Sequence, residues 1–125
     1  MAALPQVVSQ AWETRKGPIV LATVSPEGVP NAIYATCVKK FDEERLVVAD
    51  NYFDKTRANI AAGSPASLLF ITEAGKAYQV KGTIEYATSG PVFDDMKTWL
   101  DPKHPGHAAT ILHVEQVFNG AAQLL

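Results

Sequence analysis

Short runs rich in β-branched and aromatic residues, each closed by turn-forming residues, constrain the fold of this chain most strongly. The clearest runs are Ile19–Val24, Arg45–Asp50 and Ala66–Ile71. A longer run, in which apolar residues alternate with polar ones, extends from Lys76 to Ala87. Runs of this composition that are bounded by glycine, proline and acidic residues are typical of β-strands. We therefore expect a mainly β domain.

The connections between these runs are short and suit hairpins. Residues Ser25–Gly28, with the sequence SPEG, form a good hairpin turn and lead into a returning strand over Val29–Phe41. A final strand is predicted over Ala108–Phe118. Few strands are separated by a helix long enough for a parallel crossover. The pattern predicts a single domain, residues 1–125, built as an antiparallel barrel of about six strands with short helices.

Three helices and a core follow from the spacing of apolar residues. One helix is expected between Leu4 and Trp12, one from Lys55 to about Ala62, and one after Pro91. Gly82, in the middle of the longest strand, predicts a bulge or a tight bend. The alternation along the strands predicts a core made of Ile19, Leu21, Val47, Leu69, Ile71, Val80, Ile84 and Ile111.

Composition excludes several classes of protein. A net charge of −2 lacks the strong basic face that nonspecific nucleic-acid binding needs. No apolar run approaches the roughly 20 residues that span a bilayer, and the first residues do not resemble a secretion leader. The single cysteine, Cys37, excludes an intramolecular disulfide and a thiolate zinc site. We therefore expect a cytoplasmic protein without a metal site.

The beginning of the helix after Asp54 is the candidate binding site. Asp54 is expected at the N-cap, which places Lys55, Thr56 and Arg57 in the first turn. Two cations are unfavourable at the positive end of a helix dipole, but a bound phosphate would use both charges, the threonine hydroxyl and the free backbone N–H groups. The alternative is a solvated helix start, where each misplaced cation costs only about 0.3–1 kcal/mol.

The order of these elements carries a resemblance to a known family. The stretches that carry it are GPIVLATVSPEGVPNAIYATCV, RLVVADNYFDKTRANIAAGSP, YQVKGTIEY and HAATILHVEQVF. Over Ile19–Phe118 the chain resembles the flavin split-barrel proteins related to pyridoxamine 5'-phosphate oxidase, and among them the small FMN-binding proteins of sulfate-reducing bacteria. The resemblance implies a six-stranded antiparallel split β-barrel that binds FMN at the interface of a homodimer.

The same resemblance implies which residues contact FMN. Lys55 and Thr56 match the family's phosphate-binding motif residue for residue, and Arg57 follows them. The flavin ring would lie along the second and third strands, and an aromatic residue at the end of the last helix would reach over the partner subunit's flavin. The residues implied for these contacts are Ile33, Tyr34, Ala35, Asp50, Asn51, Tyr52 and Trp99. The alternative for the two tyrosines is packing in the barrel, and for the tryptophan it is capping of its own core.

The function implied is that of an FMN-binding oxidoreductase, which exchanges electrons or hydride with an unidentified partner. The chain lacks the tail whose arginine and histidine bind the vitamin substrate of the oxidase, so that reaction is not expected. One alternative is a deazaflavin or haem protein of the same fold, with His104, His107 or His113 as the axial ligand of a haem. The other is a dimeric binding module without turnover. Apolar residues on the last helix and on residues 121–125 are expected to supply contact area for the dimer.

Overall fold

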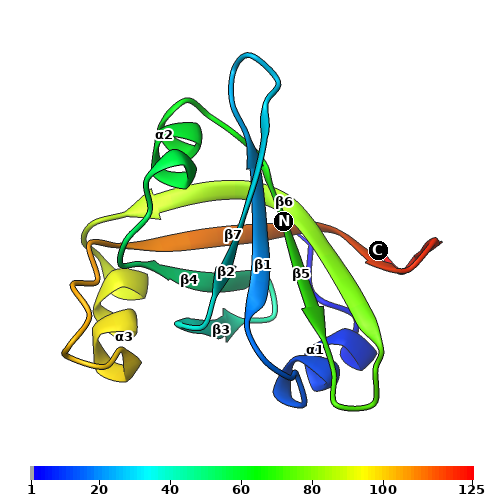
Figure 1. Ribbon diagram of the computed structural model, residues 1–125. Helices are drawn as coiled ribbons and strands as arrows, with labels where there is room; N and C mark the ends of the chain where they lie inside the picture. Colours follow the sequence, from blue (N-terminus) through cyan, green and yellow to red (C-terminus); the bar gives the residue numbers. More distant parts are fainter. Residues whose placement is uncertain (1) are drawn as a thin grey trace.

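A computed structural model describes residues 2–125 and shows a curled antiparallel sheet with three short helices (Figure 1). The first helix, α1, spans Gln6–Glu13, α2 spans Lys55–Ala61 and α3 spans Pro91–Trp99. Each helix among the described residues is too short or too polar to cross a lipid bilayer. The strands are β1 (Ile19–Val24), β2 (Pro30–Ala35), β3 (Val38–Asp42), β4 (Arg45–Asp50), β5 (Ala66–Ile71), β6 (Ala77–Ala87), β7 (Ala108–Asn119) and β8 (Ala122–Gln123).

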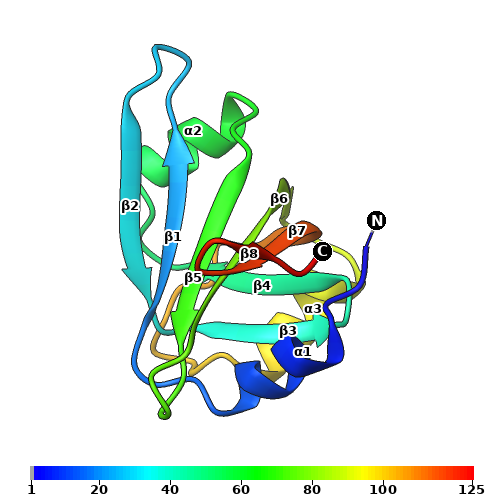
Figure 2. The ribbon, with the colours of Figure 1, turned by 90° about the vertical axis from the view of Figure 1, so that its right-hand side faces the viewer.

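The order of the strands confirms the predicted antiparallel split barrel and corrects the strand number from six to eight. Seven strands follow the order β2-β1-β5-β6-β7-β4-β3, and β8 pairs with β7. The expected single strand over residues 29–41 is in fact β2 and β3, which lie at the two ends of this order. Residues Thr36 and Cys37 connect them. Figure 2 shows β1, β2 and β5 running across the direction of β3 and β4.

The interior of the barrel is filled by side chains from both halves of the sheet and from α1. Leu21, Leu68 and Val80 are buried there, and α1 adds Val8 and Trp12. The ring of Trp12 meets Phe70 edge to face, with 5.2 Å between the ring centroids. Helix α1 therefore closes one end of the barrel, which explains why its apolar face follows the helical period.

A second cluster lies between α3 and the outer surface of β4 and β7. Val47 and Ile111 belong to this cluster together with Val92, Met96 and Leu100 of the α3 region. Strand β4 is thus covered on both faces. In a strand covered in this way, polar residues do not alternate with apolar ones. These three side chains are buried within their own chain, so the contact area that we predict this helix to supply to a dimer would have to come from its other residues.

The predicted core is correct in most strands and wrong in β5. Leu69 and Ile71 are 41% and 45% exposed, whereas Ala66, Leu68 and Phe70 point inward. Every residue from Leu68 to Ile71 is apolar. The sequence therefore does not distinguish the residues that face the core from those that alternate with them and face outward. Ile84 packs against the core and is only partly buried.

Gly82 marks a bulge in the pairing of β6 with β7, as predicted. The register shifts between Lys81 and Gly82. A Cβ atom at Gly82 would lie 1.8 Å from the carbonyl oxygen of His113. Only glycine allows the two backbones to approach this closely. The bend of the long strand therefore depends on this one residue.

Candidate functional site

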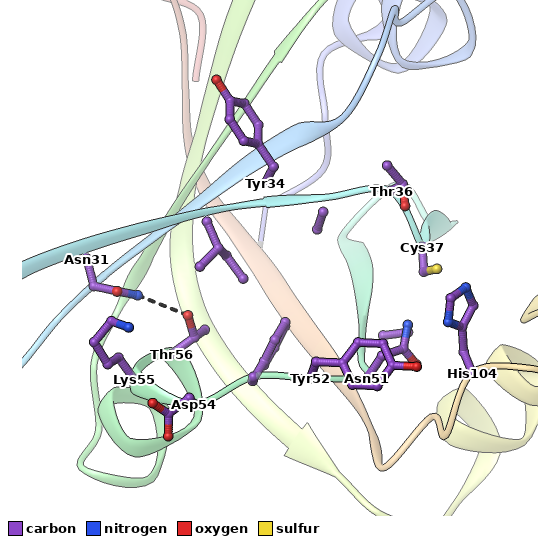
Figure 3. A pocket seen from close by; sticks show the side chains of 14 residues that line it. Asn31, Tyr34, Thr36, Cys37, Asn51, Tyr52, Asp54, Lys55, Thr56 and His104 are labelled. Carbon is purple, nitrogen blue, oxygen red and sulfur yellow. Dashed lines mark hydrogen bonds between the residues drawn. The ribbon is translucent and has the colours of Figure 1, made fainter.

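A pocket of about 320 Å³ opens between the edge strand β2 and the connection from β4 to α2 (Figure 3). Its volume is at the lower end of the range for small-molecule sites, about 300–1,000 Å³. Because β2 and β3 lie at opposite ends of the strand order, the link between them borders the opening of the barrel. The lining residues are Asn31, Ile33, Tyr34, Ala35, Thr36, Cys37, Ala49, Asn51, Tyr52, Phe53, Asp54, Lys55, Thr56 and His104.

One end of the pocket, which we call the anion end, is formed by Asn31, Lys55 and Thr56. Thr56 is 1% exposed, and its Oγ1 atom accepts a hydrogen bond of 2.9 Å from the Asn31 amide. Since the hydroxyl accepts this bond, its own proton remains available for a ligand. Lys55 makes no hydrogen bond or ion pair with the described residues and extends into the same end of the pocket in Figure 3.

A buried network behind Thr56 holds the anion end in place. The Asn31 amide also donates to Thr23 Oγ1 at 3.3 Å, and Asn59 of α2 donates to the same oxygen at 3.0 Å. These bonds connect β1, β2 and α2. Asn31 and Thr56 are therefore fixed before any ligand binds, which lowers the entropic cost of binding.

Asp54 occupies the predicted N-cap position of α2, but its side chain makes no capping hydrogen bond. The backbone there has φ −128° and ψ −85°, outside the usual extended conformation of a cap. Asp54 lines the pocket next to Lys55. Its carboxylate therefore contributes negative charge to the anion end and does not stabilise the helix through a side-chain cap.

The opposite end, which we call the ring end, contains Cys37, Asn51, Tyr52 and His104. Tyr52 is 74% exposed, and its ring meets that of His104 edge to face with 6.2 Å between centroids. The Asn51 Oδ1 atom accepts a hydrogen bond of 3.0 Å from the backbone N–H of Gly106. The loop before β7 is thereby tied to the connection between β4 and α2.

The side chains on the two faces of strand β2 differ in character. Ile33 and Ala35 pack against the core below the pocket. The Tyr34 ring is 77% exposed and points away from Lys55 and Thr56 in Figure 3. The alternative of packing inside the barrel is therefore wrong for Tyr34, and equally for the exposed Tyr52. A large aromatic surface remains uncovered beside the pocket.

Two of the predicted contact residues, Asp50 and Arg57, bind each other and do not line the pocket. Asp50 is fully buried. Its carboxylate accepts bonds of 2.8 and 3.0 Å from Arg57, 2.5 Å from the Tyr86 hydroxyl and 3.0 Å from the Phe53 backbone. Burial opposes ionisation of Asp50, but these four donors outweigh it and hold its pKa below the ordinary value. Burial and the Asp50 carboxylate together raise the pKa of Tyr86.

Trp99 does not line the pocket within one chain. Its side chain packs, partly buried, against the cluster between α3 and β4. This placement agrees with the alternative in which the residue caps its own core. Contact with a partner's flavin stays a prediction.

Sequence reasoning missed the roles of Asn31 and His104 in the pocket. Asn31 is directly opposite Thr23 in the pairing of β1 and β2, so two inward polar residues at matched positions were the available signal. Among the three histidines, only His104 lines the pocket, because His107 is exposed and His113 bonds Glu85 at 2.9 Å. Within residues 2–125 no cluster of three or more histidine, cysteine or acidic residues is suited to hold a metal ion.

Comparisons with known proteins agree with this architecture. The family model of pyridoxamine 5'-phosphate oxidase matches residues 8–120. An uncharacterised protein of Methanocaldococcus jannaschii, MJ0282, is 28% identical over 106 residues, which is 81% of this chain and 71% of that protein.

Two solved structures share the fold. HupZ of Group A Streptococcus has a TM-score of 0.81 at 24% identity and covers 96% of each chain. A structure described as an FMN-binding protein from Syntrophomonas wolfei has a TM-score of 0.77 at 16% identity, covering 90% of this chain and 83% of that one. At these identities the likeness establishes the split-barrel fold.

Proposed function

The chain belongs to the pyridoxamine 5'-phosphate oxidase family, and we propose that it is an FMN-binding flavoprotein that exchanges electrons or hydride with a partner molecule. The observation that carries this proposal is the anion end of the pocket. There an uncommitted lysine, a threonine hydroxyl with a free proton and an asparagine that orients it meet at one point. This is the donor set that a phosphate monoester requires.

The rest of the pocket suits a flat heteroaromatic ring. The pocket is bounded by apolar side chains of β2 on one side and by the exposed Tyr52 on the other. The ring end adds polar atoms from Asn51 and His104. A flavin mononucleotide has an anionic end and a flat ring with one polar edge, so its chemistry matches the order of groups along the pocket.

The protein's own residues would bind and orient the flavin. When FMN is bound, it supplies hydride and electron transfer by its own chemistry. Lys55 and Thr56 would hold the phosphate, and the buried network from Asn31 to Asn59 would keep that end rigid.

We also propose that the active form is a homodimer. An apolar row crosses the outer face of the sheet through Tyr34, Val20 and Leu69, which are register partners in β2, β1 and β5. Tyr34 and Leu69 are exposed in the single chain, and Leu124 and Leu125 are exposed as well. Since β2 separates this outer face from the pocket, a second copy on the row would lie close to the pocket opening.

If the dimer forms through this apolar row, a charged residue placed in the row should disrupt it. Leu69→Lys should convert the protein to a monomer in multi-angle light scattering at micromolar concentration, because a lysine would be buried in an apolar contact. Glu73→Lys, in an exposed turn, is the matched control and should leave the dimer intact. A wild-type monomer that is fully loaded with flavin would contradict the proposal.

The cofactor is tested by the visible spectrum of the purified protein after reconstitution. FMN is expected to give flavin bands and a stable complex. Deazaflavin binding in preference to FMN, or a Soret band after addition of haem with His104 as the ligand, would replace the proposal with one of the alternatives. No binding of any of the three would refute the cofactor assignment.

Lys55→Ala tests the phosphate site directly. A charge-assisted hydrogen bond contributes about 1.5–3 kcal/mol, so the variant should weaken FMN binding by about tenfold to a hundredfold. Riboflavin lacks the phosphate and should be nearly insensitive. Lys76→Ala, outside the pocket, is the matched control. Equal losses for FMN and riboflavin would mean that Lys55 supports the fold and does not contact the phosphate.

A further inference from the structure

A second hollow, which we call the Arg15 groove, borders the link between β2 and β3 next to the segment that joins α1 to β1. Its volume is about 410 Å³ and its surface is mostly polar. Ala35 and Thr36 line both this groove and the pocket that contains the anion end, so the two hollows are neighbours along one short stretch of chain. The residues that line the groove are Glu13, Arg15, Gly17, Ala35, Thr36 and Val38.

The side chain of Arg15 is held in place by its own chain. Its Nη1 atom donates a hydrogen bond of 2.9 Å to the backbone carbonyl of Trp12, and its guanidinium carbon lies 4.2 Å from the centroid of the Trp12 ring. The backbone of Arg15 pairs with that of Thr72. A long side chain that is ordered before a ligand arrives loses less entropy on binding.

The three arginines of the chain differ in their partners. Arg45 forms an ion pair with Asp42, and Arg57 forms one with Asp50. Among residues 2–125, Arg15 forms no ion pair, and its hydrogen-bond acceptor is a neutral backbone carbonyl. The remaining N–H groups of its guanidinium therefore stay available to an acceptor in the groove.

Partial burial makes the unpaired Arg15 cation unfavourable. Burial lowers the pKa of Arg15, and the nearby Glu13 carboxylate, which acts in the opposite direction, does not cancel the effect. The Glu13 side chain is 68% exposed, and its carboxylate lies 4.0 Å from the Lys40 ammonium. An anion bound in the groove would supply the counter-charge that the chain does not.

The charges of the groove indicate which kind of anion fits. Glu13 and Arg15 are the charged residues that line it, and their formal charges sum to zero. A guanidinium presents parallel N–H groups that match the two oxygens of a carboxylate. A singly charged carboxylate gains this contact, whereas the second charge of a phosphate dianion would have no counter-ion in the groove. The groove therefore suits a different anion from the one proposed at Lys55 and Thr56.

We propose that the Arg15 groove binds the carboxylate of a small, singly charged organic acid, with the guanidinium of Arg15 as its anchor. This inference does not depend on the flavin, since every group that it uses lines the groove. The alternative is that Arg15 only covers the ring of Trp12, which is 2% exposed. The two accounts differ in what an added acid does to the guanidinium.

Benzoate is the probe, and benzamide, which has nearly the same shape without the charge, is its control. In protein labelled with ¹⁵N at arginine, benzoate added at constant ionic strength should shift the Nε resonance of Arg15 until it saturates. The Nε resonances of Arg45 and Arg57 should stay in place, because these arginines already hold carboxylates. Benzamide should move none of the three. An unchanged Arg15 resonance, or equal shifts of all three, would overturn the proposal.

Variants identify the anchor through saturation-transfer NMR of benzoate. Arg15→Gln should weaken benzoate binding by at least about tenfold, because the charge-assisted hydrogen bonds are lost. Lys16→Gln removes the same charge from an exposed neighbour outside the groove, and it should leave the affinity unchanged. Arg15→Lys keeps the charge without the planar fork and should weaken binding by about threefold or more, which preserves the test if the glutamine variant does not fold.

Glu13→Gln provides a test in the opposite direction. The substitution removes the negative charge from the groove, so benzoate should bind about twofold more tightly, and added salt should reduce the gain. A role of Arg15 in covering Trp12 alone predicts no such gain. Full benzoate affinity in Arg15→Gln, or weaker binding in Glu13→Gln, would refute the carboxylate site and leave the flavin proposal untouched.

Discussion

The Asp50 cluster and the pocket share the connection between β4 and α2, yet their polar groups are satisfied in opposite ways. The buried Asp50 carboxylate receives four hydrogen bonds from three residues of its own chain. In the pocket, Lys55 has no partner among the described residues, and Nδ1 of His104 is buried without one. The two cations in the first turn of α2 therefore act differently. Arg57 forms an ion pair with Asp50 within the chain, and Lys55 remains available for a ligand.

This difference separates structural from binding residues without reference to motifs. A polar group that the chain satisfies contributes to stability, since removing its partner leaves a buried charge. A polar group that the chain leaves unsatisfied contributes to binding when a ligand satisfies it. The comparison therefore predicts that substitutions in the cluster change the free energy of unfolding, and that substitutions in the pocket change ligand affinity.

The largest effect is expected from Asp50→Ala. The substitution leaves Tyr86 and the Phe53 backbone without their acceptor, and we expect the free energy of unfolding to fall by about 2–4 kcal/mol. Arg57 can turn toward water, so the loss stays below that of a fully enclosed ion pair. Urea denaturation followed by circular dichroism measures it. A variant as stable as wild type would show that the cluster does not hold α2 on the sheet.

The contribution of Asp50 should also depend on pH with a defined sign. Its pKa is lower in the folded chain than in the unfolded one, where it is about 3.9. The stability it provides is therefore present above pH 4 and is lost as pH falls through the folded pKa. Wild type should exceed Asp50→Asn in stability at pH 6, and the gap should narrow at pH 3. A gap that widens in acid would mean that the carboxyl is protonated in the native state.

Thr56→Val should produce a moderate effect on binding and a small one on stability. The variant keeps the shape of the side chain and removes the hydroxyl that faces the pocket. We expect FMN affinity to fall by about threefold to tenfold, with riboflavin changing less. The unfolding free energy should change by about 1 kcal/mol or less, because Asn31 keeps its bond to Thr23. A large loss of stability with unchanged FMN affinity would place Thr56 with the structural residues.

The smallest effect is expected from Asp54→Ala. An N-cap bonded through its side chain would lose about 0.5–2 kcal/mol on this substitution. Since Asp54 makes no such bond, thermal unfolding should change by no more than about 0.5 kcal/mol. FMN titration should show equal or slightly tighter binding, because a carboxylate next to the phosphate is removed. A loss of stability in the range of a cap would contradict the observed geometry.

Much of the fold could be predicted from the sequence because it depends on local pattern. The bounds of β1, β4 and β5 agree with the predicted runs, and α2 begins at Lys55 as expected. Turn residues and the strand period act over a few neighbours, so they are visible in one chain. The bulge at Gly82 belongs to the same group, since a glycine inside a strand has few other reasons to occur.

Part of the site could be predicted for the same reason. Lys55, Thr56, Asn51 and Tyr52 follow one strand end and one helix start, and the pocket brings them together. Asp50 and Arg57 belong to the same stretch of sequence, but Tyr86 of β6 accompanies them and turns them into a structural cluster. The structural role of Asp50 and Arg57 therefore depends on a strand that lies far along the chain.

The sequence by itself determined β1, β4 and β5, the start of α2, the family, and Lys55 and Thr56 of the anion end, because each is encoded by neighbours in the chain. Only the tertiary structure decided which face of β5 points inward, that residues 29–41 bend at Thr36 and Cys37 to join both edges of the sheet, and that His104 enters the pocket. These outcomes depend on which distant surfaces cover a residue, and burial is a property of the packed molecule.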